Sequence, residues 1–268
     1  MKRVILIIAL VLFPLTPAEG KDPVSQKIPE RVVSLKPNIT QTLIDFGLAS
    51  RIIGMTKYCE RPNAQATVVG DYKNFDSERV LRLKPDLVIT SPENANSQEF
   101  FALENAGIKT LLLNFQNLEE TLHSFRILDE TFALKTPKEK FETELEDLRK
   151  LATPLTGKIF TVIVQRQPLM VAGGTSYIST LLSRIGFKNA FAQNKIAYPI
   201  LDEEIFIREN ADFVFDMTQS PETGQPFLNK NVFVLETKDF LASPRNVQAL
   251  KNLINKLSEN TGTPGVAQ

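Results

Sequence analysis

Few side chains in this sequence could carry catalysis or hold a metal ion. His123 is the only histidine and Cys59 is the only cysteine. A site built from several histidine ligands is therefore excluded, and catalysis by a histidine base would depend on one residue. His123 falls in residues 118–132, whose polar–apolar periodicity predicts a helix, so we interpret it as a surface residue of that helix. Cys59 has no partner cysteine and can form no disulfide within the chain.

Residues 173–176 form the one stretch that could suggest a nucleophile loop or a phosphate cradle. They read Gly-Gly-Thr-Ser. The stretch lacks the G-x-S-x-G spacing of a nucleophile elbow and the lysine of a phosphate-binding loop. We interpret it as a glycine-rich turn that leads into a helix. The sequence thus predicts no catalytic residue, no metal site and no enzyme, with an exported hydrolase kept as a remote alternative.

A set of charged residues recurs at the same spacing in the two halves of the chain. The sets are Asp76, Glu78, Arg82 and Asp86, and then Asp202, Glu204, Arg208 and Asp212. In each set the first aspartate is placed to cap a helix, which puts the glutamate at the second helical position, where the helix dipole favours a carboxylate. A second pattern precedes each set: Thr40, Leu43 and Gly47, and then Ser179, Leu182 and Gly186. Two matching patterns in the same order predict a duplicated lobe.

The elements around these residues alternate between strand and helix. Short β-branched or apolar runs predict strands, and the segments between them have helical periodicity with glycine stops. This alternation predicts an α/β fold of two lobes with central, mainly parallel sheets. Predicted strands are 31–35, 52–55, 87–90, 110–113, 159–165, 212–216 and 232–235, and predicted helices include 97–106, 137–151, 176–185 and 246–257.

The amphipathic segment 137–151 predicts a helix long enough to cross between two lobes. We therefore expect an N-terminal lobe at 28–134, a linking helix at 135–156 and a C-terminal lobe at 157–260, with a ligand cleft between the lobes. A surface helix is the other interpretation of this segment.

The N-terminus has the pattern of a secretory signal. Lys2 and Arg3 precede the apolar run 4–13, and Ala18 and Gly20 follow. The run is too short to span a bilayer, so we expect a signal peptide at 1–20, cleaved near residues 18–20, rather than a membrane anchor.

Lys+Arg and Asp+Glu both number 31 in the 268 residues, which leaves no basic excess for nucleic acid.

Four stretches resemble a known family. They read RVVSLKPNITQTLIDFG, GMTKYCERP, SERVLRLKPDLVIT and, at 242–245, ASPR. Over residues 31–257 the chain is similar to the class III periplasmic substrate-binding proteins of ABC importers, which serve cobalamin, siderophores and haem. The Tyr-Cys-x-x-Pro turn at Tyr58 is typical of the cobalamin-receptor branch. The resemblance implies two α/β lobes joined by one long helix.

The resemblance also implies roles for particular residues. Glu78 and Glu204 match the glutamates that dock on the permease, and Tyr58, Tyr72 and Tyr198 match aromatic positions of the ligand cleft. Leu169 and Met170 match an apolar wall of that cleft. This chain departs from the cobalamin receptors in having no tryptophan. Thr237 and Leu241 also supply no charge where some of those receptors place charged ligand contacts.

The function implied is that of an exported, monomeric binding protein in the periplasm that hands a corrinoid ligand to an ABC importer permease. No cofactor is expected, and the protein is not expected to insert into the membrane after signal cleavage. A receptor of the same fold for haem or a ferric siderophore is the alternative, because the phenolate of Tyr58, Tyr72, Tyr177 or Tyr198 could ligate iron.

Overall fold

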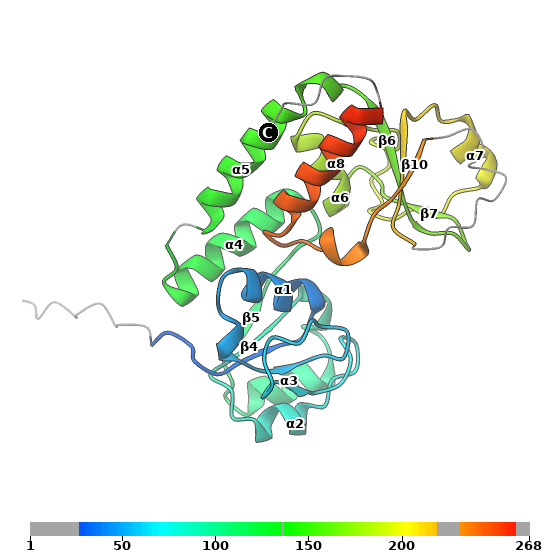
Figure 1. Cartoon of the computed structure of the whole chain (residues 1–268). Coiled ribbons are helices and arrows are strands. Elements are labelled where there is room, and N and C mark those ends of the chain that lie inside the picture. The colour runs from blue at the N-terminus through cyan, green and yellow to red at the C-terminus, as the bar shows by residue number, and fades with distance from the viewer. Residues whose placement is uncertain (1–26, 136, 219–230, 261–268) are drawn as a thin grey trace, which may run out of the picture.

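The computed structural model describes residues 27–135, 137–218 and 231–260, which form two α/β lobes (Figure 1). The expected signal peptide at 1–20 lies outside the described residues. In the part of the chain that is described, no helix is both long and apolar enough to cross a membrane.

The N-terminal lobe is built on a five-stranded sheet in the order β3-β2-β1-β4-β5. All of its strand pairs are parallel. Buried on both faces, its central strands are almost continuously apolar, as parallel strands covered by helices should be. Its elements are β1 (Val32–Ser34), α1 (Pro37–Asp45), β2 (Ile52–Met55), β3 (Thr67–Val68), α2 (Ser77–Arg82), β4 (Leu87–Thr90), α3 (Gln98–Asn105) and β5 (Thr110–Leu112), with 3-10 turns at Ala49–Arg51 and Pro92–Asn94.

The C-terminal lobe has a second sheet in the order β10-β9-β6-β7, with β8 paired to β6. The pairs are parallel apart from β6 with β7, which is antiparallel. Its elements are β6 (Ile159–Gln165), β7 (Met170–Val171), α6 (Tyr177–Arg184), β8 (Lys188–Asn189), α7 (Glu203–Arg208), β9 (Phe213–Asp216), β10 (Val232–Val234) and α8 (Asn246–Asn260), with 3-10 turns at Thr153–Leu155 and Thr237–Asp239.

The two sheets share one topology. Four strands of the first sheet, β2-β1-β4-β5, match β8-β6-β9-β10 of the second, and the helices α1 and α6 follow the equivalent strands β1 and β6. Gly47 and Gly186 end the helices α1 and α6 with positive φ angles of 78° and 110°, a conformation that suits glycine. The predicted duplication of lobes and the mainly parallel sheets are thus confirmed.

The repeated aspartates Asp86 and Asp212 have the same structural role in the two lobes. The carboxylate of Asp86 accepts hydrogen bonds from the backbone N–H groups of Glu30 (3.0 Å) and Arg31 (3.1 Å), just before β1. The carboxylate of Asp212 accepts one from Ile159 N–H (2.7 Å) at the start of β6 and pairs with Lys158 (2.9 Å). Each aspartate, which directly precedes β4 or β9, therefore fixes the start of that strand to the start of the neighbouring strand in the sheet, β1 or β6.

These contacts predict a pH-dependent contribution to stability. The hydrogen bond from Glu30 N–H holds the pKa of Asp86 below its usual range, although burial acts in the opposite direction. Burial also raises the pKa of Asp212, but the hydrogen bonds from Ile159 and Lys158 outweigh it, so the pKa of Asp212 is lowered as well. A carboxyl group whose pKa is lower in the folded state than in the unfolded state stabilises the fold when it is ionised. This stabilisation is fully present above the pKa of the unfolded state, which is about 4, and it is lost as the pH falls through the pKa of the folded state.

Asp86→Ala or Asp212→Ala is therefore expected to lower the free energy of unfolding at neutral pH by about 1 kcal/mol. Urea unfolding at neutral pH and below the folded pKa of each aspartate measures this, and the loss should shrink in acid. Asp147→Ala is the control, since Asp147 only pairs with Lys150 on an exposed helix face. An equal loss in the control would contradict the assigned role.

The helix that joins the lobes is α4 (Leu118–Phe132). Its buried Leu118 and Phe125 belong to the apolar core of the C-terminal lobe. Leu128 and Phe132, further along the same helix, belong to a core cluster of the N-terminal lobe. One continuous helix thus contributes to both cores.

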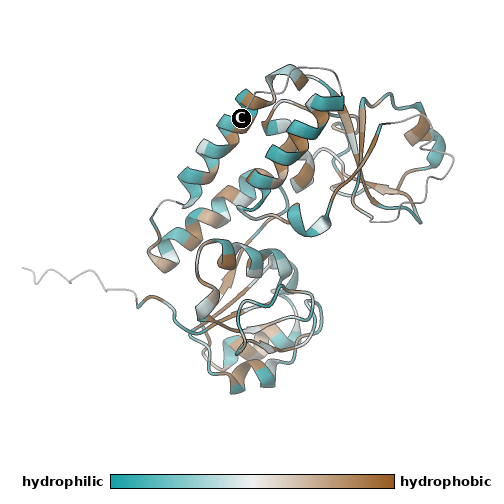
Figure 2. Cartoon of the chain, in the orientation of Figure 1, coloured by the Kyte–Doolittle hydropathy of each residue, from teal (hydrophilic) through white to brown (hydrophobic). Residues whose placement is uncertain are grey.

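The following helix, α5 (Pro137–Leu151), packs on the C-terminal lobe instead of crossing between the lobes. Its buried residues Phe141, Leu145 and Leu148 lie in the C-terminal core, while its outer side is hydrophilic (Figure 2). The packing therefore differs from the expectation that residues 135–156 form the link. The amphipathic pattern showed that this helix buries one face, but such a pattern cannot show which core the face covers. The lobe boundaries at 28–134 and 157–260 stay a prediction.

Candidate binding site between the lobes

A hollow of about 460 Å³ lies where the carboxyl ends of the N-terminal strands face the C-terminal lobe. Loops at the carboxyl ends of parallel strands are where open α/β sheets place ligand sites. Its lining residues are Lys36, Asn38, Ser91, Pro92, Glu93, Leu113, Asn114, Phe115, Gln116, Ala197 and Tyr198. A second hollow of about 210 Å³ shares Asn38, Phe115 and Tyr198 with the first, so the two are parts of one cleft. The second is also lined by Pro37, Tyr177, Phe240, Leu241 and Ala242.

Tyr198 is the predicted aromatic residue that the structure places on the cleft wall. It lines both hollows and is 44% exposed. Its backbone segment is held against β7 and the following turn, because Gly173 N–H donates to Ala197 O (2.9 Å) and Val171 N–H donates to Pro199 O (3.1 Å). Burial raises the pKa of the Tyr198 phenol, which therefore carries no charge at neutral pH.

The glycines of the Gly-Gly-Thr-Ser stretch make this close approach possible. A Cβ on Gly173 would lie 2.1 Å from the carbonyl oxygen of Ile196, and one on Gly174 would lie 2.0 Å from that of Ala192. The Ser176 side chain then caps α6 by accepting a hydrogen bond from Ser179 N–H. The interpretation as a glycine-rich turn leading into a helix is confirmed, and the turn positions the segment that carries Tyr198.

Tyr72 lies behind one lining residue of the cleft and does not line it. The ammonium of Lys36 lies 4.9 Å from the centre of the Tyr72 ring and forms an ion pair with Glu93. Asn94 also donates a hydrogen bond to the Tyr72 backbone carbonyl (2.8 Å). Tyr72 thus contacts the lining of the cleft through Lys36.

Tyr58, Met170 and Leu169 are absent from the described lining. Tyr58 is 64% exposed, with the Lys57 ammonium 4.6 Å from its ring centre. Met170 is partly buried in β7 and bridges to Ile200. Leu169 packs in the core of the C-terminal lobe, so the expected apolar wall does not include it. Ligand contact by Tyr58, Tyr72, Tyr198 and Met170 stays a prediction.

Several lining residues were not predicted from the sequence. Phe115 is held by an edge-on contact with Phe125 of α4, with ring centres 6.3 Å apart. Asn114 is held in the same loop because Ser124 of α4 donates to its backbone carbonyl (2.7 Å). Glu93 follows β4, and Asn38 follows β1. The available signal was position: each follows the carboxyl end of a predicted parallel strand.

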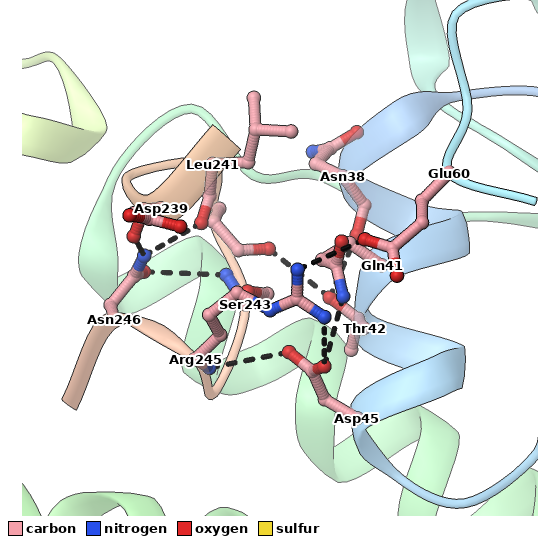
Figure 3. A network of polar contacts seen from close by, with 11 residues as sticks. Asn38, Gln41, Thr42, Asp45, Glu60, Asp239, Leu241, Ser243, Arg245 and Asn246 are labelled. Carbon is pink, nitrogen blue, oxygen red and sulfur yellow. Dashed lines mark hydrogen bonds and ion pairs between the residues drawn. The ribbon is translucent and has the colours of Figure 1, made fainter. Parts of the chain in front are cut away.

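Thr237 and Leu241, where the resemblance implied missing charges, have structural surroundings of their own. The Thr237 hydroxyl donates to the backbone carbonyl of Met217 (2.8 Å). Leu241 lines the smaller hollow, beside the Asn38 carboxamide (Figure 3). An apolar side chain therefore contributes to the cleft at this position.

Glu78 and Glu204 occupy equivalent, fully solvated positions. Their side chains are 85% and 84% exposed, and each lies 3.6 Å from the arginine four residues later, Arg82 or Arg208. Each is the second residue of its helix, α2 or α7. These helices lie at the outer ends of the two lobes, away from α4 (Figure 1).

A network of polar contacts, here called the Arg245 clasp, joins the lobes beside the cleft (Figure 3). The guanidinium of Arg245 donates to Glu60 Oε2 (2.9 Å) and to Asp45 Oδ1 (3.1 Å), and its backbone N–H donates to Asp45 Oδ2 (3.2 Å). The buried Thr42 hydroxyl donates to Ala242 O (3.1 Å). The end of α1 is thereby tied to the start of α8.

Removing this clasp should loosen the arrangement of the lobes. Arg245→Ala is expected to lower the free energy of unfolding by about 1–2 kcal/mol, because the half-buried Asp45 loses a charged partner. The radius of gyration from small-angle scattering should also rise. Arg149→Ala, at an exposed pair on α5, is the control. A clasp variant with the scattering profile and stability of that control would contradict the assignment.

His123 and Cys59 have ordinary structural surroundings. His123 is exposed on α4, with its Nδ1 2.8 Å from the Arg126 guanidinium. The Cys59 sulfur lies 3.1 Å from the hydroxyls of Thr40 and Thr56. Within the described ranges no group of three or more His, Cys, Asp or Glu residues is placed to hold a metal ion.

Two relatives match most of the chain in sequence. An ABC transporter substrate-binding lipoprotein of Bacillus subtilis, YvrC, is 26% identical over 218 residues, which cover 76% of this chain and 69% of the relative. A vitamin B12-binding protein of Pectobacterium carotovorum is 24% identical over 246 residues, which cover 86% of this chain and 89% of the relative.

Solved structures share the two-lobed fold. The periplasmic vitamin B12-binding protein BtuF of Vibrio cholerae matches with a TM-score of 0.72 at 20% identity, over 87% of this chain and 98% of that one. The periplasmic haem-binding protein HutB of Vibrio cholerae matches with a TM-score of 0.73 at 19% identity, over 85% of this chain and 98% of that one.

The family assignment follows from the sequence itself. Residues 32–251 match the model of the periplasmic binding protein family, a span that includes both sheets, α4 and every residue found to line the cleft. This chain belongs to the periplasmic binding protein family.

Proposed function

We propose that this protein binds a corrinoid between its lobes and delivers it to the permease of an ABC importer. The observation that carries the proposal is the cleft, whose walls come from both lobes and combine Phe115 and Tyr198 with neutral polar groups. Aromatic side chains offer flat apolar area to a large ring, and a few polar groups fix its orientation. Relatives named as vitamin B12-binding proteins support the same ligand class.

Binding without catalysis fits the chemistry of the cleft. Among its described lining residues there is no histidine or cysteine, and the single carboxylate, Glu93, is paired with Lys36. General acid–base catalysis is most effective when a side chain that reaches the substrate has a pKa near the operating pH. The proposed role is therefore that of a binding protein, with no catalytic residue.

Glu78 and Glu204 are proposed as the two contacts with the permease. Their matched exposure, their matched helix positions and their place at the outer ends of the lobes support this role. Charged contacts of this kind mainly set the orientation of binding and the rate of encounter. The proposed setting is the periplasm, reached through a signal peptide cleaved near residues 18–20, with the protein acting as a monomer.

Isothermal titration of the purified protein tests the ligand class. Cyanocobalamin and a cobinamide are expected to bind with one site per chain, and haem and ferric siderophores are expected to bind more weakly. Tyr198 on the cleft wall keeps an iron ligand available, whereas the buried Tyr177 hydroxyl donates to Asn246 Oδ1 (2.5 Å). Tight binding of haem or a ferric siderophore without corrinoid binding would replace the corrinoid by that alternative.

A further inference from the structure

Two charged side chains lie in the cleft, and they neutralise each other. Of the described residues that line either hollow, Lys36 and Glu93 are the ones that carry a charge. They form an ion pair with each other. The remaining polar lining consists of the neutral groups of Asn38, Ser91, Asn114, Gln116 and the two tyrosines.

The ammonium of Lys36 is held by its surroundings and is not free to meet an anionic ligand. Its side chain is 13% exposed, and its Nζ also lies over the Tyr72 ring. The Glu93 side chain is 74% exposed, so the carboxylate is the more accessible member of the pair. An approaching ligand therefore meets a negative group before it meets the positive one.

Lys57 and Lys73, the lysines beside Tyr58 and Tyr72, do not line the cleft. Lys57 contacts Tyr58 and lies 3.9 Å from Asp71. Lys73 lies over Tyr72 at 5.7 Å from the ring centre and is exposed, which leaves its charge to solvent screening. A ligand anion that enters the cleft would lose hydration without gaining an unpaired positive partner among the described lining residues, and this is costly.

We propose that the Lys36–Glu93 pair makes the cleft select against ligands with net negative charge. Neutral ligands rich in amides gain hydrogen bonds from Asn38, Asn114 and Gln116, whereas carboxylate-bearing tetrapyrroles and catecholate iron chelates are repelled by Glu93. The inference rests on the proposed function, since it takes the cleft as the ligand site. It assigns to Glu93 the role of a specificity-determining residue.

The test compares ligands of opposite charge on matched variants. Wild type, Glu93→Gln, Lys36→Met and the control Glu104→Gln are titrated with cyanocobalamin, haem, a neutral ferric tris-hydroxamate and a trianionic ferric tris-catecholate. Glu104 is exposed on α3 and does not line the cleft, so its variant changes net charge alone.

Glu93→Gln should free the Lys36 charge and raise affinity for haem and for the catecholate by about fivefold at low salt. The quantity compared is the ratio of anionic to neutral affinity, because a lost contact would affect both kinds of ligand whereas the change in charge acts on the anionic ligands. Lys36→Met should weaken binding of the anionic ligands. In high salt, the rise in affinity for the anionic ligands caused by Glu93→Gln should vanish. The control should behave as wild type.

The inference is overturned if Glu93→Gln leaves the ratio of anionic to neutral affinity unchanged, or if wild type prefers the anionic ligands. If wild type binds cyanocobalamin and only the charge effect is missing, the selectivity fails and the proposed function stands. If wild type binds none of these ligands, the proposed function fails and the selectivity falls with it.

Discussion

Charge reversal at Glu78 and Glu204 together is expected to abolish ligand uptake while ligand affinity stays within a few-fold of wild type. Both carboxylates are almost fully exposed, at the outer ends of different lobes, and they are absent from the cleft lining. Removing the charges should therefore disturb the encounter with a partner and leave the ligand site intact. Uptake of labelled ligand by cells that carry Glu78→Lys with Glu204→Lys measures the first effect, and titration of the purified variant measures the second.

The matched control for this variant is Glu104→Lys with Glu259→Lys. These glutamates are exposed, one on α3 of the N-terminal lobe and one on α8 of the C-terminal lobe. The control changes net charge equally and should transport normally. Normal uptake by the Glu78 and Glu204 variant, or loss of ligand binding in it, would contradict the docking role.

Tyr198→Ala is expected to weaken ligand binding by about thirtyfold, equivalent to about 2 kcal/mol, because aromatic anchors in a cleft carry much of the binding energy. Tyr198 lines both hollows, and the backbone on either side of it is fixed because Ala197 O and Pro199 O accept hydrogen bonds from residues 173 and 171. Calorimetric titration of the variant measures the loss, and its melting temperature should stay close to that of wild type.

Tyr58→Ala serves as the comparison, since Tyr58 is more exposed and lies outside the described lining. We expect a smaller loss of affinity for this variant than for Tyr198→Ala. Equal losses would show that the ligand extends beyond the two hollows to the Tyr58 turn. A larger loss for Tyr58→Ala would contradict the placement of the ligand beside Tyr198.

The duplicated α/β architecture could be predicted because its signals are local. Asp86 and Asp212 stand at the same distance from matching helix-start patterns, and each directly precedes an apolar strand. Gly47 and Gly186 likewise mark helix ends through a backbone conformation that one residue type prefers. Such features depend on residues close in sequence, and they led to the correct sheets and to the equivalence of Glu78 and Glu204.

The packing between distant segments could not be predicted in the same way. Residues 118–132 and 137–151 are both amphipathic, and only the folded arrangement shows that the first contributes to both cores while the second covers one. The Arg245 clasp joins residues that are 185 and 200 positions apart. The pairing of Lys36 with Glu93 likewise depends on how two strand ends lie side by side.

The most direct test of the account is the position of cobalt in crystals grown with cyanocobalamin. An anomalous difference map is expected to show one cobalt peak between the lobes, with the ring against Tyr198 and Phe115 and with contacts to Asn38 across the cleft. A peak on the surface of a single lobe, or no peak in crystals exposed to saturating ligand, would contradict a corrinoid site formed by both lobes.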